Sequence, residues 1–316
     1  MTAGESLRHK SGKGPGREVS AGLPPGLNYG RGESDEVPLA RRSFRRRLLA
    51  QTNARIGLIL LGVMVLACLF GPIFYHQSPV NQNLAVALEG PSAQHVLGTD
   101  EYGRDELARL LYGGRYSITL GVVAVIIGIA IGMPIGAASG YFGGRVDLVL
   151  QRITEVFMSF PGILLALALV AALGVNLQNI LVAVTVSSIP VFIRLARASA
   201  LTIRELPYIE AARSLGSSRW RNVFVHVMPN SIAPIAVQAS LQVGLTILTA
   251  AGLGFLGLGV PPPDPEWGEM LGDAQTVIFR DPWLAIFPGI AIFLVVIGFN
   301  LLGDGLRSVL DPRELR

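Results

Sequence analysis

The sequence predicts an all-α polytopic membrane protein with six transmembrane helices. Of its 316 residues, 51% are hydrophobic, and the mean hydropathy of +0.50 is too high for an ordinary soluble domain. The hydrophobic residues are gathered into six blocks, each close to the ~20 residues that a helix needs to cross a bilayer. Arginine-rich and acid-rich segments alternate between these blocks, which is typical of a chain that crosses the membrane repeatedly.

The predicted spans cover residues 56–74, 117–138, 153–172, 180–198, 232–258 and 284–302. In the second span, Gly128, Gly132 and Gly136 recur at every fourth position and therefore share one helix face. Such a face of small residues predicts close packing against another helix. Pro161 and Pro190 are expected to bend or end helices near the membrane surface, because proline lacks the amide donor that a helix needs.

The distribution of arginine predicts that both ends of the chain are cytoplasmic. The arginines are concentrated in segments that six spans would place on one side, namely 41–55, 145–152, 194–221 and 307–316. The two segments that would lie opposite, 89–106 and 264–281, each hold five acidic residues and one arginine. This arrangement satisfies the positive-inside preference at every loop. The net charge of +4 then follows from topology, and no nucleic-acid partner is expected.

The chain divides into three predicted parts. Residues 1–45 are rich in Gly, Pro, Ser and charge, and we expect a disordered cytoplasmic tail without a signal peptide. Residues 46–112 are expected to hold the first transmembrane helix and an extracytoplasmic loop. Residues 113–316 are expected to form the core transmembrane domain, with a polar loop at 205–230 on the cytoplasmic side.

The sequence lacks the patterns expected of an enzyme or a metalloprotein. It contains no G-x-x-x-x-G-K-[ST] phosphate loop, no His, Cys and carboxylate cluster at metal-ligand spacing, and no nucleophile–base arrangement. Ionisable residues are also missing from the centres of the predicted spans, where ion-coupled carriers bind their ions. We therefore expect no catalytic residue, no metal and no cofactor in this chain. A stand-alone secondary carrier or channel, and a non-transporting scaffold or receptor, stay open as alternatives.

The polar segment 207–230 separates two long apolar runs and predicts two short helices on the inner membrane face. Pro207 suits a first helical position, and Glu210 lies in the first turn, where a carboxylate favours the positive helix end. Gly216 suits the left-handed residue that closes this helix, and either of the two serines that follow can cap the next. Pro229 is expected to end the pattern before the fifth span. The alternative is an amphipathic linker that rests on lipid.

The spacing Glu-Ala-Ala, three residues, Gly, nine residues and x-x-Met-Pro resembles the EAA loop of ABC importer permeases, with Met228 where Leu is common. In that family the loop forms a coupling helix that inserts into a cleft of the ATPase subunit. The resemblance implies a charged contact from Glu210 to an ATPase arginine, and close approach at the alanines. The docking residues implied in this way are Glu210, Ala211, Ala212, Gly216 and Pro229.

Further motifs resemble the peptide and nickel branch of this family. The segment from His95 to Asp105 resembles the H-x-L-G-T-D-x-x-G-R-D signature, and segments 255–263, 265–271 and 299–313 resemble its later elements. The likeness covers about residues 45 to 316. It implies an extracytoplasmic loop that faces a binding protein, although these residues also suit a tight, self-paired loop. The loop residues concerned are Gly98, Thr99, Asp100, Gly103, Arg104 and Asp105. Trp267 and Trp283 are expected to be interfacial anchors.

The resemblance implies the type I ABC importer permease fold and the second, or C-type, transmembrane subunit. The implied function is the import of di- or oligopeptides, or a related solute such as glutathione or nickel, across the bacterial cytoplasmic membrane. The implied partners are a sister permease in a heterodimer, an extracytoplasmic solute-binding protein and two ATPase subunits. ATP and Mg²⁺ are expected on those ATPase subunits and not on this chain.

Overall fold

The computed structural model describes residues 44–310, so nearly all of the tail predicted at 1–45 lies outside the described residues. Within them, every named element is helical. The elements are α1 (Phe44–Ala50), α2 (Thr52–Phe74), η2 (Leu84–Val86), α3 (Glu106–Phe142), α4 (Gly144–Met158), α5 (Gly162–Leu173), α6 (Leu177–Ile203), α7 (Pro207–Ser214), α8 (Arg219–Arg221), η3 (Asn222–Val227), α9 (Met228–Asn230), α10 (Ile232–Leu253), η4 (Gly254–Leu258), α11 (Trp267–Ala274) and α12 (Trp283–Leu310). The predicted all-α class is confirmed.

Five helices in residues 44–310 are long and apolar enough to cross a membrane, and a bent pair makes six if it forms one span. That pair is α4 and α5, which meet at an angle of 85°. The span predicted at 153–172 is therefore broken at Pro161, where the sequence predicts a bend or a helix end. Pro161 stands at the N-cap of α5 with φ −54° and ψ 131°, outside the helical region, so the chain turns there.

Unlike Pro161, Pro190 does not interrupt a helix, because α6 continues on both sides of it. A helix end at this position, one of the two predicted outcomes, is therefore wrong. Pro190 is buried within α6, and helix packing of this kind lets transmembrane helices keep prolines that would end a helix in water.

The glycine face of α3 packs against α6, as predicted. A Cβ atom at Gly128 would lie 2.7 Å from the Ser188 hydroxyl, and one at Gly132 would lie 2.9 Å from the carbonyl of Ile189. At Gly136 the same atom would overlap the Ile193 carbonyl. The two backbones therefore approach so closely that only glycine fits between them.

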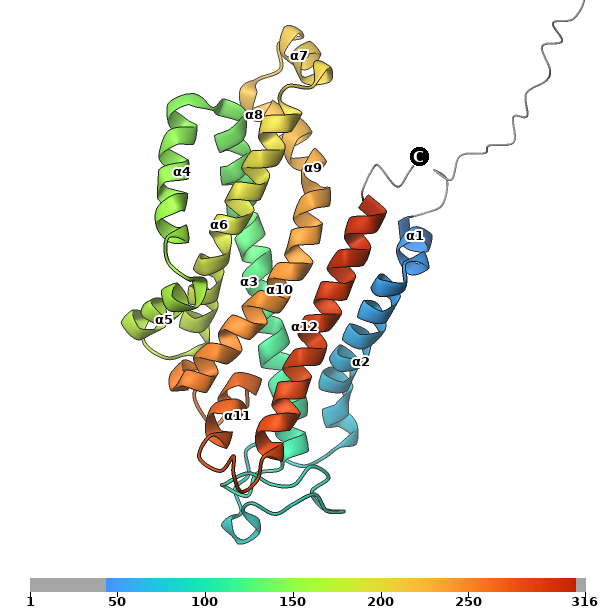
Figure 1. Ribbon diagram of the computed structural model, residues 1–316, viewed down its shortest axis with the longest axis vertical. Coiled ribbons are helices and arrows are strands. Elements are labelled where there is room, and N and C mark those ends of the chain that lie inside the picture. The colour runs from blue at the N-terminus through green and yellow to red at the C-terminus, as the bar shows by residue number, and fades with distance from the viewer. Residues whose placement is uncertain (1–43, 311–316) are drawn as a thin grey trace, which may run out of the picture. The chain divides into compact units, whose positions relative to one another are not determined.

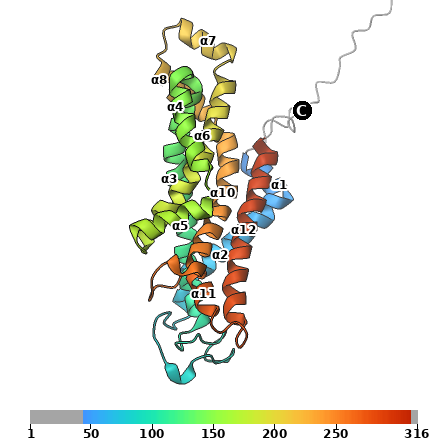
Figure 2. The same cartoon turned by 60° about the vertical axis from the view of Figure 1, so that its left-hand side comes forward.

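The long helices form a bundle in residues 44–310, with α10 packed against α3, α6 and α12, and α2 packed against α3 and α12. Its apolar core draws on most of these helices, including Leu61, Val125, Phe192, Ile247, Trp267 and Val295. Figures 1 and 2 show α7 at one end of the bundle, the same end at which α1 begins and α12 finishes. The loop 75–105 and α11 lie at the other end, and α3 connects the two.

Candidate docking loop and outer ion cluster

The loop at 205–230, called the docking loop below, has the predicted local geometry. Pro207 is the first residue of α7, and Gly216 adopts φ +85° directly after that helix. Ser218 caps the next helix by accepting a hydrogen bond from the Arg221 amide at 3.3 Å. A Cβ atom at Gly216 would meet no neighbour, so glycine is needed there for its backbone angle and not for space.

The second arm of the docking loop differs from the prediction at Pro229. Instead of ending there, the helical backbone continues from Arg219 through η3 and α9 into α10. The Ser231 amide bonds to the Val227 carbonyl at 3.0 Å, so the helix resumes directly after the proline. The preceding π-helical segment supplies an extra residue, a common way to accommodate a disrupted hydrogen-bond ladder. The second arm is thus an extension of the fifth span.

The predicted docking residues lie on the accessible side of the loop. Glu210, Ala211, Gly216 and Pro229 are exposed, and Ala212 is half-buried. Leu215, which sequence reasoning missed, is 88% exposed at the turn. A leucine so fully exposed in a structured loop is the kind of side chain that a partner surface covers. The contact of Glu210 with an ATPase arginine stays a prediction.

Tyr141, near the end of α3, binds the docking loop by hydrogen bonds. Its hydroxyl accepts hydrogen bonds from Arg213 Nε at 3.0 Å and from Asn222 Nδ2 at 2.8 Å. Beside it lies a hollow of about 470 Å³ with an excess of basic side chains. The residues that line this hollow are Tyr141, Phe142, Arg204, Glu205, Arg213, Ser217 and Arg219.

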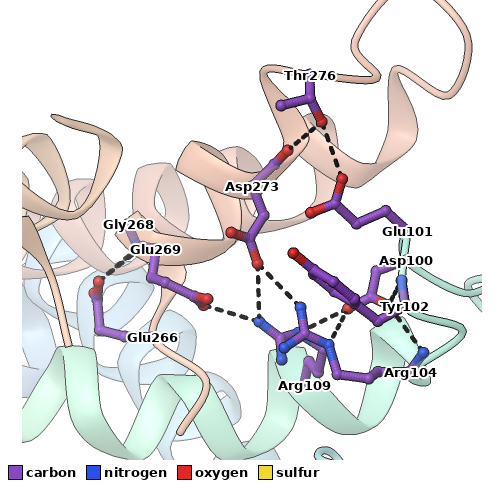
Figure 3. Close-up of polar contacts among 10 residues, drawn as sticks. All are labelled: Asp100, Glu101, Tyr102, Arg104, Arg109, Glu266, Gly268, Glu269, Asp273 and Thr276. Carbon is purple, nitrogen blue, oxygen red and sulfur yellow. Dashed lines mark hydrogen bonds and ion pairs between the residues drawn. The ribbon is translucent and has the colours of Figure 1, made fainter. Parts of the chain in front are cut away.

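At the other end, a cluster of ion pairs joins the start of α3 to α11 (Figure 3), and it is called the outer ion cluster below after the side that the sequence predicts for it. Arg104 Nε lies 2.5 Å from Asp100 Oδ2, and Arg104 Nη2 lies 3.0 Å from Asp273 Oδ2. Arg109 Nη2 lies 2.8 Å from Glu269 Oε2. Both arginines are almost fully buried, and carboxylates from two distant segments neutralise their charge.

The outer loop that precedes this cluster is self-paired. Asp105 caps α3 by accepting from the Ala108 amide at 2.8 Å, and it also contacts His95 Nδ1 and the Tyr75 hydroxyl, each at 2.8 Å. Burial, together with this contact to Asp105, raises the pKa of Tyr75 to about 12. Gly103 adopts φ +70° and lies against the Asn83 backbone.

The structure therefore brings the predicted outer-loop residues together in the self-paired arrangement that the sequence left open. Thr99, Asp100, Arg104 and Asp105 are all buried. Gly98 also adopts a positive φ, of +84°. A role of this loop toward a binding protein stays a prediction.

Trp267 corrects a further expectation, because it is fully buried and is not an interfacial anchor. Its Nε1 donates to the Leu110 carbonyl at 2.9 Å. The neighbouring Glu266 caps α11 by accepting from the amides of Gly268 and Glu269, at 2.9 Å and 3.1 Å, and the Ser117 hydroxyl donates to its Oε1 at 2.6 Å. The segment 265–271 thus fastens α11 to α3.

The acidic side chains of α11 in the outer ion cluster were missed by sequence reasoning. Their signal in the sequence is the excess of acidic residues at 264–281, which membrane topology alone also explains. Burial raises the pKa of Glu269, whereas Arg109 opposes this shift. No group of three or more His, Cys, Asp or Glu side chains within residues 44–310 is arranged to hold a metal ion.

The family models and relatives that match this chain are transport permeases. The model described as "Binding-protein-dependent transport system inner membrane component" matches residues 132–316, and the "N-terminal TM domain of oligopeptide transport permease C" matches residues 40–91. The dipeptide transport system permease protein DppC of Alkalihalophilus pseudofirmus is 45% identical, over 86% of this chain and 90% of its own length. The glutathione transport system permease protein GsiD of Pectobacterium atrosepticum is 44% identical, over 86% of this chain and 91% of its own length.

Two further similarities come from a third relative and from a solved structure. The probable D,D-dipeptide transport system permease protein DdpC of Escherichia coli is 43% identical, over 81% of this chain and 86% of its own length. A chain of the MetNI methionine ABC transporter, in an inward facing conformation, superimposes with a TM-score of 0.52 at 20% identity. It covers 64% of this chain and 96% of that chain, which supports a shared fold.

Proposed function

Because this chain belongs to the family of binding-protein-dependent transport system inner membrane components, we propose that it is the permease subunit of an ATP-driven importer of di- or oligopeptides. The membership agrees with the family predicted from the docking loop and the outer signature. The observation that carries the peptide assignment is the 45% identity with a dipeptide permease over 86% of this chain. Glutathione is the second candidate, since a relative named for it is 44% identical.

The proposed energy source lies in partner subunits. The exposed face of α7 and Leu215 supply a surface for one of two ATPase subunits, and the second ATPase acts on the other half of the channel. A sister permease forms the other half, and a solute-binding protein delivers the peptide to the outer end. In this scheme the chain itself catalyses no reaction. ATP-bound ATPases favour one orientation of the helix bundle over the other, which shifts the population between inward and outward openings.

The proposed topology places the docking loop and both chain ends in the cytoplasm of the bacterial cell. Arg45, Arg46 and Arg307 lie in helices whose ends share the α7 end of the bundle (Figure 1). Arginine prefers the cytoplasmic side of membrane proteins. The loop 75–105 and α11 then face the outside.

The test of this function is ATP-dependent uptake of a labelled dipeptide into liposomes. We expect uptake when the chain is reconstituted with the sister permease, both ATPases and the binding protein, and none when it is reconstituted alone. Competition by unlabelled glutathione separates the two candidate substrates. Uptake by the chain alone would favour a stand-alone carrier, and absence of flux with all partners present would favour a scaffold.

A further inference from the structure

The docking loop contacts the membrane helices through a compact patch centred on α3. Ile209 is the fully buried residue of α7, and it packs in a cluster with Tyr141 and residues of α6 and η3. The rest of α7 is largely exposed. Helix α7 therefore contacts the bundle through few residues, and a movement that a partner imposes on α7 must reach the bundle through them.

Tyr141 binds both arms of the docking loop at one atom. Its hydroxyl oxygen accepts from Arg213 Nε in α7 at 3.0 Å and from Asn222 Nδ2 in η3 at 2.8 Å. These donors lie on opposite sides of the Gly216 turn. The Arg213 guanidinium also lies 5.1 Å from the Tyr141 ring centroid, close enough for a cation–π interaction.

Two further contacts stiffen this junction. The Ser217 hydroxyl donates to Asn222 Oδ1 at 2.6 Å, which fixes the orientation of the Asn222 amide. Phe142 packs edge-on against Trp220, with ring centroids 4.8 Å apart. The last two residues of α3 therefore contact both arms. Tyr141 is 5% exposed, its bond from Asn222 is buried, and its bond from Arg213 is part-buried.

Helix α3 carries this junction to the opposite end of the bundle. It is continuous from Glu106 to Phe142, a length of about 55 Å at the usual helical rise. In its first turn, Arg109 pairs with Glu269 in the outer ion cluster. One helix thus joins the docking loop to the outer ion cluster.

We propose that Tyr141 is the positioning residue that transmits movement of the docking loop to α3, and so couples ATP hydrolysis to opening at the outer end. This inference rests on the proposed function. Arg213 and Asn222 hold the two arms to Tyr141, so that α7 and α3 move as one body. Without the hydroxyl, α7 still docks on the ATPase, but its movement is only partly passed to α3.

The test uses Tyr141→Phe in the complete transporter, with sister permease, ATPases and binding protein in liposomes. The substitution keeps the buried ring and removes the acceptor. We expect subunit association and basal ATP hydrolysis to be retained, while peptide taken up per ATP hydrolysed falls about tenfold, the size expected for a lost charge-assisted hydrogen bond. The matched control is Tyr112→Phe, which removes a half-buried hydroxyl near the other end of α3 and keeps the ring, whose centroid lies 4.9 Å from the Arg115 guanidinium. This control should couple like the parent protein.

A second readout follows the movement itself. Spin labels at Leu206→Cys, the N-cap residue of α7, and at Ile126→Cys on α3, both exposed positions, report the distance between the two helices. On ATP binding we expect this distance to stay constant in the parent protein and to change in Tyr141→Phe. Arg213→Lys keeps the charge but loses the guanidinium, so we expect it to behave like Tyr141→Phe. It replaces Tyr141→Phe in the test if Tyr141→Phe folds poorly.

Unchanged coupling and an unchanged distance in both variants would overturn the inference. Equal loss in Tyr112→Phe would also overturn it, because the effect would then belong to α3 as a whole and not to the hydroxyl of Tyr141. If the parent protein takes up no peptide, the proposed substrate is wrong. The label distances still test the inference in that case, since they require only ATP and the ATPase subunits.

Discussion

At the scale of single residues, the local surroundings of Gly216 and Arg109 restrict which residue type each position accepts. Gly216 adopts φ +85° in open space, so only its backbone angle is constrained. Arg109 is 1% exposed and has carboxylates on two sides, so its constraint is electrostatic. A substitution at either site therefore has one dominant physical effect, which makes it a clean probe.

Gly216→Val should prevent the docking loop from closing its turn, because a β-branched residue in the left-handed region costs about 1–2 kcal/mol. We expect normal membrane insertion and about a tenfold loss in the amount of ATPase subunit that copurifies with the permease. Gly62→Val is the control, since Gly62 lies in α2 with open space around its Cβ position. Undiminished copurification in Gly216→Val would contradict the docking role of this turn.

Arg109→Met should leave Glu269 buried without its main partner, and removing one partner of a buried ion pair costs about 3–5 kcal/mol. Burial raises the pKa of Glu269, and the loss of Arg109 raises it further. The neutral form is therefore favoured in the folded protein, so the stability of the folded state is highest below the ordinary Glu pKa of 4.5 and falls as pH rises through the raised value.

The measurement for Arg109→Met is thermal unfolding in detergent at about pH 5 and about pH 8, where we expect the larger destabilisation at the higher pH. Arg152→Met is the matched control, because Arg152 forms an exposed pair with Glu155 at 2.9 Å. Exposed pairs contribute little to stability, so little change is expected at either pH. An equal loss for Arg109→Met at both pH values would show that the site is not governed by the charge of Glu269.

At the scale of elements, small residues predict which helix faces pack together more directly than apolar residues do. The glycine repeat of α3 predicted a close helix contact, and α6 occupies it. The repeat is informative because a helix face without side chains allows the backbone of a neighbouring helix to approach closely. Apolar residues in the same helices face both lipid and protein, so their pattern indicates a span without naming its partner.

Gly136→Ala should loosen the α3–α6 contact, because the added methyl group overlaps the Ile193 carbonyl. We expect a loss of about 1–3 kcal/mol, typical of overpacking, seen as a lower unfolding temperature in detergent. Gly289→Ala in α12 is the control, since nothing lies within 4 Å of its Cβ position. A similar loss in both variants would mean that helix propensity, and not the contact with α6, determines the effect.

The elements also mark where the sequence was insufficient. Pro161 and Pro190 carry the same local signal, yet one begins a new helix after a turn and the other lies inside α6. The difference depends on which residues pack around each proline, and the adjacent sequence does not determine those neighbours. The outer ion cluster was missed for the same reason, since Arg109 and Glu269 are 160 residues apart. By contrast, the Gly216 turn and the Ser218 cap were predictable because their causes lie within a few residues.

At the scale of the whole molecule, the bundle separates two structurally different ends that α3 connects. The end with α7 presents an exposed surface with arginines nearby, as a cytoplasmic partner would require. The opposite end holds a compact, self-paired loop and a buried ion cluster. This asymmetry agrees with an importer that receives energy at one end and solute at the other.

Labelling from the two sides of the membrane tests this orientation. The sole cysteine, Cys68, is 4% exposed and should not react, so single cysteines can be introduced without replacing it. Leu84, in η2 of the outer loop, is 72% exposed, and Leu215 in the docking loop is 88% exposed. With a membrane-impermeant thiol reagent, Leu84→Cys should be labelled in spheroplasts and Leu215→Cys only in inside-out vesicles. Labelling of both from one side would exclude the proposed topology, whereas crosslinking of Leu84→Cys to the binding protein would identify the outer loop as its contact surface.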